Sequence, residues 1–357
     1  MRLPAILLLL ALSTGIDAQQ KHVLLEEFTG AHCGICPNGA YYTDSMLTMH
    51  PSLITVAVHT YGIYDAMVFP AIDTIGQAFA AGAPLGAVDR ICSSPPSTNT
   101  GVYINQWDAA IAQQELQWPS LTVSVLPSWN NTTRNITATV TVNILADLPA
   151  GDYRISLYVV EDSVTGTGSG YDQANLYDQV SGSPWYGLGD PIVGYVHRHV
   201  ARALLPGAWG RPGVIPSAPT TGQTFNTTFT YTLPAGYDEN HVSLVAFVNE
   251  VSSDHSGDEV LNAVETDLMN PTGTDDYSAT GFNVYSPSSG TLVIENAPAG
   301  STCEFYDVTG RLTATEIISP AGSATVTMNN SSGGIYFVVV RSEAVVSTRK
   351  VFVTVRN

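Results

Sequence analysis

The sequence is poor in basic residues. It has 13 Lys plus Arg against 31 Asp plus Glu, which gives a net charge of −18 at pH 7, and its lysines are Lys21 and Lys350. Nucleic-acid-binding surfaces depend on clustered Lys and Arg, so this balance argues against nucleic acid as a partner. Charged residues make up only 12% of the 357 residues, against 44% hydrophobic ones. That ratio excludes a mainly disordered chain and allows a sizeable core.

Long apolar runs are also scarce. The most marked one covers residues 3–12, follows Arg2 and is succeeded by a polar stretch that ends at Ala18. This order is typical of a secretory signal peptide, which we place at residues 1–18. A membrane-spanning helix needs about 20 apolar residues, so we expect no transmembrane span. The sequence therefore predicts a mature protein that is exported.

Residues 22–119 alternate between strand-like and helix-like patterns. Apolar runs at 23–28 and 53–58 predict strands, and residues 36–50, 71–81 and 104–111 have room for helices. Strands that alternate with helices predict an α/β domain here.

Residues 120–269 change to a period of two. Apolar and polar residues alternate at 136–144, 153–159, 225–231 and 242–248, which predicts antiparallel strands with one solvated face. We expect a β-sandwich, interrupted by a Gly- and Pro-rich excursion at 166–219. An excursion of this length has its own structure or a function.

A polar linker at 270–280 precedes a third region, residues 281–357. Six short apolar segments there predict a small all-β sandwich, with strands near 282–285, 291–294, 303–308, 324–328, 335–340 and 350–355.

Four cysteines are too few for a disulfide scaffold, but two of them form a close pair, Cys33 and Cys36. The pair follows a predicted strand at the expected start of a helix. Unpaired N–H groups and the positive dipole end of a helix favour thiolate over thiol. Protonated His32 would add positive charge. This pattern predicts Cys33 as the nucleophile and the more buried Cys36 as the resolving cysteine.

Two other interpretations stay open for the pair. It is either a structural disulfide that fixes a loop, or half of a metal site that would need two more ligands. His197 and His199 lie on one predicted strand face, but such pairs more often bind carbonyls or carboxylates than a metal. We therefore predict neither a metal nor a cofactor.

The fragment VLLEEFTGAHCGICPNG, together with GAPLGAVDR at 82–90, resembles the thioredoxin-like start of the 28-kilodalton outer-membrane-protein family of Gram-negative bacteria. The resemblance continues through YVHRHVAR at 195–202, LVAFVNE at 244–250 and EVLNA at 259–263, and so covers about residues 22–268. It implies a location in the envelope or at the cell surface.

In thioredoxin-like sites a cis-proline loop lies opposite the cysteine pair and binds a partner chain. The resemblance therefore implies a cis Ala83–Pro84 bond, with Ala83, Pro84 and His32 contacting the partner. Thioredoxins carry Trp in the position of His32. They also have a buried acid beneath the pair, for which Glu26 and Glu27 are candidates by their position in the strand.

The tail resembles a type IX secretion sorting domain in three sequence blocks, FNVYSPSSG at 282–290, EFYDVTGR at 304–311 and GIYFV at 334–338. The resemblance implies that the type IX machinery exports the protein to the cell surface or the medium. The sequence thus predicts a thioredoxin-like α/β domain, a β-sandwich and a sorting tail.

For function we expect thiol-disulfide exchange at Cys33 and Cys36 on cysteine-containing envelope or extracellular proteins. The alternative is a non-enzymatic binding or adhesive surface protein in which the same disulfide is only structural.

Overall fold

The computed structural model describes residues 21–60, 64–91, 100–255 and 258–269, and in the tail 283–288, 291–295, 297, 299–307, 311–320, 322–327, 334–341 and 346–353. The chain divides into two compact units, residues 1–272 and 273–357. The predicted signal peptide and linker, and Cys92, lie outside the described residues. Within those residues, no helix has the length and apolar character needed to cross a bilayer.

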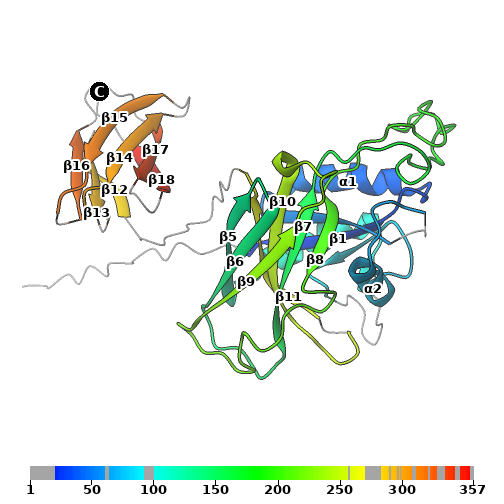
Figure 1. The fold of residues 1–357 in the computed structure, drawn as a ribbon, viewed down its shortest axis with the longest axis horizontal. Coiled ribbons are helices and arrows are strands. Elements are labelled where there is room, and N and C mark those ends of the chain that lie inside the picture. The colour runs from blue at the N-terminus through cyan, green and yellow to red at the C-terminus, as the bar shows by residue number, and fades with distance from the viewer. Residues whose placement is uncertain are drawn as a thin grey trace, which may run out of the picture. The chain divides into compact units, whose positions relative to one another are not determined.

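The described part of the first unit contains an eight-stranded sheet with the order β11-β10-β7-β8-β2-β1-β3-β4 (Figure 1). Strand β1 is parallel to β2, β2 is parallel to β8, and the other neighbours are antiparallel. The strands are β1 Val23–Thr29, β2 Leu53–His59, β3 Leu85–Val88, β4 Gly101–Val102, β7 Tyr153–Glu161, β8 Val200–Leu205, β10 Val242–Glu250 and β11 Val260–Asp267.

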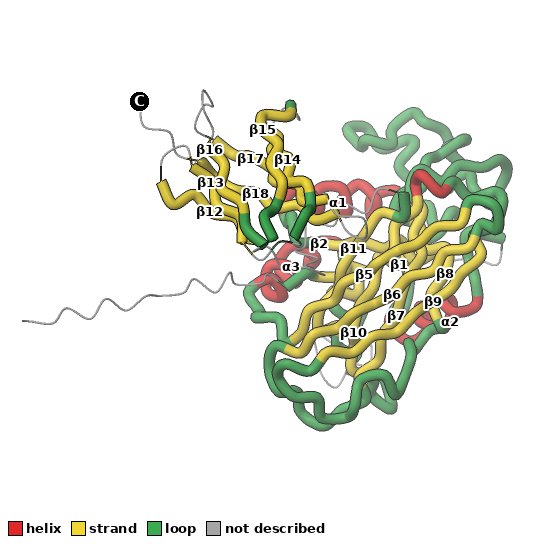
Figure 2. The backbone as a smooth tube through the Cα atoms, turned by 60° about the vertical axis from the view of Figure 1, so that its left-hand side comes forward, coloured by secondary structure: helices red, strands yellow, loops and turns green. Residues whose placement is uncertain are grey.

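A smaller sheet of order β5-β6-β9 covers part of one face of this large sheet (Figure 2). Its strands are β5 Leu121–Asn130, β6 Asn135–Ile144 and β9 Thr224–Thr232. Val140 on β6, Ile155 on β7 and Leu244 on β10 belong to the core that the two sheets share. The outer face of β6 is polar and exposed or half-buried, as its alternation predicted.

The helices of the first unit pack on both faces of the large sheet. They are α1 Cys36–Met49, α2 Pro70–Phe79 and α3 Trp107–Glu115, with short 3-10 helices at Ile104–Gln106 and Glu239–His241. Ile75 of α2 shares a core with Phe28 of β1, whereas Met46 of α1 and Trp107 of α3 share another with Leu25. Because side chains alternate along a strand, α2 covers one face of β1, and α1 and α3 cover the other.

The prediction of an α/β domain separate from a β-sandwich is wrong. The chain is mostly β, and its described residues contain no self-contained helical thioredoxin-like domain. Strand β2 of the first predicted region pairs with β8 of the second, with Ala57 opposite Val200, so one sheet runs through both regions. The pattern of apolar residues shows that a segment is a strand, but it does not show which other strand pairs with it.

Strands β7 and β10 also differ from the prediction. Both were expected to have one solvated face, yet nearly every residue of each is buried. They lie centrally in the first unit, with Leu157 and Leu244 toward the small sheet and Tyr158 and Phe247 toward the side of α2.

The second unit contains two sheets of order β12-β13-β16 and β15-β14-β17-β18 in its described residues. Leu292, Phe305 and Val338 belong to their common core. The strands are β12 Asn283–Ser288, β13 Thr291–Glu295, β14 Thr302–Asp307, β15 Leu312–Ile317, β16 Ala324–Thr327, β17 Gly334–Arg341 and β18 Val346–Val353. Strand β15 was not predicted, since all of its residues are exposed or half-buried and give no apolar pattern.

Candidate functional site

The cysteine pair lies in the loop between β1 and α1. Cys33 and Cys36 form a disulfide, and their Cα atoms are 5.3 Å apart. Helix α1 begins at Cys36, so Cys33 lies in the turn before the helix and not at its first residue. No acidic residue is present in the first helical turn. The positive end of the helix dipole therefore acts on the disulfide without a neutralising carboxylate in that turn.

A proline loop lies opposite the disulfide, directly before β3. The Ala83–Pro84 peptide bond is cis, as predicted. The Sγ atom of Cys33 is 3.7 Å from the carbonyl oxygen of Ala83, which brings the two predicted site segments together.

A groove of about 710 Å³ extends from this proline loop. None of the lining residues that the structure describes is charged, and they include Ile35, Pro84 and three tyrosines, Tyr42, Tyr103 and Tyr177. Ile35 lies between the two cysteines in the sequence, so the groove borders the disulfide loop. An uncharged wall with aromatic rings suits an extended polypeptide with apolar side chains.

The disulfide itself is well covered. Cys33 is 5% exposed and Cys36 is 1% exposed, so Cys33 is the more exposed of the two. His32, by contrast, is exposed, and its ring meets that of Tyr64 edge-on at 6.3 Å between centroids. His32 is not among the residues that line the groove. Its contact with a partner stays a prediction.

Of the two candidate acids, Glu27 is the one that contacts α1. Its Oε2 atom accepts a hydrogen bond from Thr43 Oγ1 of α1 at 2.8 Å, and its Oε1 atom has no hydrogen-bond partner. A Cβ atom on Gly39 would lie 2.3 Å from Oε1. Cys36, Gly39 and Thr43 follow each other at helical spacing on one buried face of α1, so the carboxyl group lies along the face that carries Cys36. Burial raises the pKa of Glu27 to about 7, against a smaller lowering by the Thr43 hydrogen bond.

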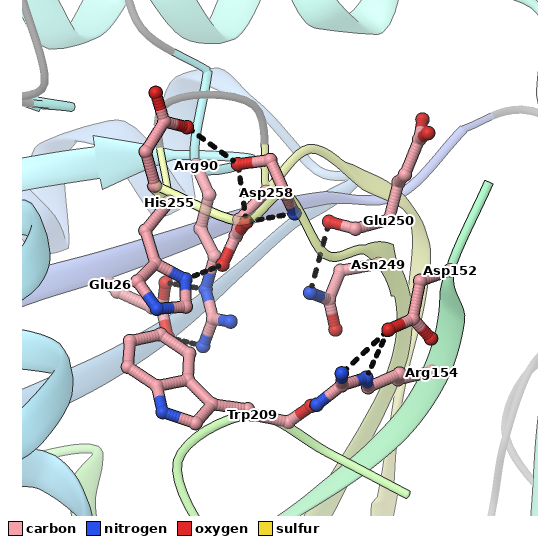
Figure 3. Close-up of polar contacts among 11 residues, drawn as sticks. Glu26, Arg90, Asp152, Arg154, Trp209, Asn249, Glu250, His255 and Asp258 are labelled. Carbon is pink, nitrogen blue, oxygen red and sulfur yellow. Dashed lines mark hydrogen bonds and ion pairs between the residues drawn. The ribbon is translucent and has the colours of Figure 1, made fainter. Parts of the chain in front are cut away.

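Glu26 is excluded from this role by its own partners. Its carboxylate accepts two hydrogen bonds from Arg90, at 2.7 and 2.8 Å (Figure 3). It accepts a third from the Tyr158 hydroxyl at 2.6 Å. Glu26 and Arg90 are both fully buried. This pair therefore holds β1 to the loop after β3 and leaves Glu27 as the candidate acid on the side of α1.

The excursion supplies contacts that the sequence did not predict. Gln173 donates hydrogen bonds from Nε2 to the backbone oxygens of Gly30, Ala31 and Cys33 at 3.0–3.2 Å. The length of the excursion was a signal that it has a role, but nothing in its composition singled out Gln173.

Two histidines that contact each other, His59 and His197, lie beside the same loop. Asp65 accepts hydrogen bonds from the Ala31 amide and from His59 Nδ1, both at 2.7 Å. His197 bonds the Tyr171 carbonyl at 2.7 Å, and burial lowers its pKa to about 4, so it is neutral at physiological pH. No group of three His, Cys, Asp or Glu side chains suited to a metal ion occurs among the described residues.

Known proteins resemble the chain in two separate segments. A family model described as Outer membrane protein Omp28 matches residues 73–270, more than half of the chain, and a model of the Secretion system C-terminal sorting domain matches residues 283–354. The first match begins after the cysteine pair. No curated protein sequence matches the chain significantly.

Among solved structures, HBP35 of Porphyromonas gingivalis is similar with a TM-score of 0.55 and 22% identity, covering 94% of this chain and 98% of that chain. A protein of Agrobacterium tumefaciens gives a TM-score of 0.41 at 11% identity, covering 69% of this chain and 93% of that one. A domain of the outer membrane lipoprotein Omp28 from Porphyromonas gingivalis gives 0.24 at 16% identity, covering 43% and 92%. The likeness to HBP35 shows a shared fold.

The sorting domain implies an interaction with the secretion machinery, and together with the family it indicates an exported protein, either at the cell surface or secreted. The chain belongs to the Outer membrane protein Omp28 family and carries a C-terminal sorting domain.

Proposed function

We propose that the protein exchanges disulfides with cysteine-containing proteins of the envelope or the extracellular space. The observation that carries this proposal is the 3.7 Å contact of Cys33 Sγ with the Ala83 carbonyl oxygen of the cis-proline loop. It is supported by the buried carboxyl group of Glu27, whose Oε1 atom has no hydrogen-bond partner. A purely structural disulfide needs neither an adjacent groove nor an acid with a pKa of about 7.

The exchange begins with a thiolate of the partner, which attacks Sγ of Cys33 because that sulfur belongs to the more exposed cysteine. A bond forms between the partner sulfur and Cys33, the Cys33–Cys36 bond breaks, and Cys36 leaves as a thiolate. Protonated Glu27 supplies the proton that neutralises it. A second thiolate of the partner then attacks the partner sulfur of the mixed disulfide, so the bond to Cys33 breaks and the partner becomes a disulfide. Cys33 leaves as a thiolate and takes a proton from the solvent, so the pair ends as two thiols.

The same steps run backwards when the pair is reduced and the partner holds the disulfide. Glu27 then accepts the proton from Cys36 as its thiol attacks the mixed disulfide. A group with a pKa of about 7 serves in both directions near neutral pH.

One observation favours the alternative of a structural disulfide in a binding protein. The two cysteines are only 5% and 1% exposed, which is typical of disulfides that do not react.

Oxidised protein incubated with a synthetic peptide that contains two thiols distinguishes the two functions. We expect the peptide disulfide to form together with reduced Cys33 and Cys36, and Cys33→Ser to abolish this transfer. Cys303→Ser is the matched control, because Cys303 is buried in the tail and burial raises its pKa to about 12. If wild-type protein oxidises the peptide no faster than the Cys33→Ser variant, the disulfide is structural.

A further inference from the structure

The side chain of Gln173 makes an unusual set of contacts with the loop that carries Cys33. Its Nε2 atom lies 3.2 Å from the carbonyl oxygens of Gly30 and Ala31, 3.0 Å from that of Cys33 and 3.2 Å from that of Ala174. Two amide hydrogens are thus shared among four oxygens, three of which belong to the cysteine loop. Gln173 as a whole residue is 3% exposed, so water competes little for these hydrogen bonds.

The backbone around Gln173 lies along the same loop. The amide of Ala174 donates to the Ala31 oxygen and that of Leu176 donates to the Gly34 oxygen, both at 2.8 Å. Gly34, between the two cysteines, allows this approach, because a Cβ atom there would lie 2.6 Å from Leu176 Cγ. We call residues 173–176 the covering segment.

The covering segment is itself held in place. Gln173 exchanges backbone hydrogen bonds with Ile192 at 3.1 and 2.8 Å. Asn175, 1% exposed, donates to the carbonyl oxygens of Trp185 and Gly189 at 3.0 and 2.9 Å. The excursion therefore presents the amide of Gln173 from a fixed position.

We propose that Gln173 is a positioning residue that sets the redox equilibrium of the Cys33–Cys36 pair. Its amide holds the carbonyl groups on both sides of Cys33, so that the Cys33 sulfur stays beside Cys36 when the disulfide opens. Two thiols kept in this geometry have a high effective concentration toward each other, which favours the disulfide. The proposal deepens the proposed function, because it concerns the same disulfide. Only its biological use rests on that function, since the equilibrium itself can be measured without a partner protein.

Loss of the Gln173 amide should shift the equilibrium toward the reduced pair. The mature chain is equilibrated in mixtures of reduced and oxidised glutathione, and peptide mapping after alkylation gives the disulfide fraction at Cys33 and Cys36. For Gln173→Met, which keeps the length of the side chain but removes its donors, we expect the equilibrium constant for disulfide formation to fall about tenfold. This corresponds to a potential about 30 mV less negative.

Gln179→Met is the matched control. Gln179 belongs to the same excursion, is exposed and bonds only its neighbour Asp178 among the contacts described, so the equilibrium should not change. Gln173→Asn keeps the amide on a shorter side chain. Its equilibrium constant for disulfide formation should lie between those of wild type and Gln173→Met. A constant for folded Gln173→Met within about twofold of wild type would overturn the proposal.

A second measurement needs no variant and decides the question if Gln173→Met fails to fold. If the covering segment favours the disulfide, then the disulfide must favour the covering segment by the same factor. Amide hydrogen exchange at Ala174 and Leu176 should therefore be faster in reduced than in oxidised wild-type protein. Equal exchange rates in the two forms would contradict the proposal. Both measurements use glutathione or no partner at all, so they succeed or fail independently of exchange with a partner protein.

Discussion

Glu26 and Glu27 are neighbours on β1, yet their carboxyl groups lie on opposite faces of the large sheet and in opposite electrostatic surroundings. Glu26 is paired with Arg90 at 2.7 Å, whereas Glu27 has one hydrogen bond, from the Thr43 hydroxyl, among its described contacts. Strand alternation separates the two side chains. The acid that is left without a cation is the one on the side of α1 and the cysteines.

Glu27→Gln should remove a pH dependence of stability. The pKa of Glu27 is about 7 in the folded protein, against an ordinary value of 4.5, so the folded state holds this proton more tightly than the unfolded state. Its contribution to stability is therefore complete below about pH 4.5 and is lost as the pH rises through 7. Relative to the variant, wild type should lose up to about 3 kcal/mol of unfolding free energy across this window.

Urea unfolding at several pH values measures this difference. Asp89, whose pKa burial raises to about 6, is present in both proteins, so its own pH dependence cancels in the comparison. Parallel stability curves for wild type and Glu27→Gln would show that Glu27 titrates normally.

Gly39→Ala should destabilise the protein, whereas Gly82→Ala should not. The new Cβ at Gly39 would lie 2.3 Å from Glu27 Oε1 and 3.0 Å from Pro84 Cβ, while one at Gly82 would meet no atom within 4 Å. We expect a cost of about 1–3 kcal/mol at Gly39 from overpacking and a change within about 0.5 kcal/mol at Gly82. Denaturant midpoints of the two variants test this, and equal midpoints would refute the close contact.

Arg90→Met should lower the unfolding free energy more than the substitution of an exposed charged residue. It would leave the fully buried Glu26 carboxylate without its cation, which costs about 3–5 kcal/mol. Arg198→Met is the control, because Arg198 pairs with Asp44 at a similar distance of 2.7 Å but both side chains are about half exposed. Exposed pairs contribute about 0–1 kcal/mol. Similar unfolding free energies for the two variants would contradict a structural role for Arg90.

The sequence predicted local features of the site well. Apolar runs located β1 and β2, because both strands are buried along their whole length, and the interval between the runs left room for α1. Together they located the loop of Cys33 and Cys36. The resemblance placed a cis bond at Ala83–Pro84, which the structure confirms.

Contacts between distant segments could not be predicted in the same way. The pairing of β2 with β8 depends on which strand reaches an open edge, and the choice between Glu26 and Glu27 depends on where Arg90 lies. Gln173 is an ordinary polar residue in an irregular segment, and its importance comes only from the carbonyl groups that the fold brings around it.

The most direct test of disulfide exchange is to trap the mixed disulfide in cells that export the protein. Cys36→Ser removes the resolving sulfur, so Cys33 should remain linked to partner proteins in adducts that a reductant releases, and the matched Cys33→Ser variant should form none through the pair. Non-reducing gels and mass spectrometry of the surface and medium fractions identify the linked cysteines. If Cys36→Ser yields no adduct beyond those of Cys33→Ser, or only dimers of the variant itself, the pair does not exchange disulfides with partner proteins.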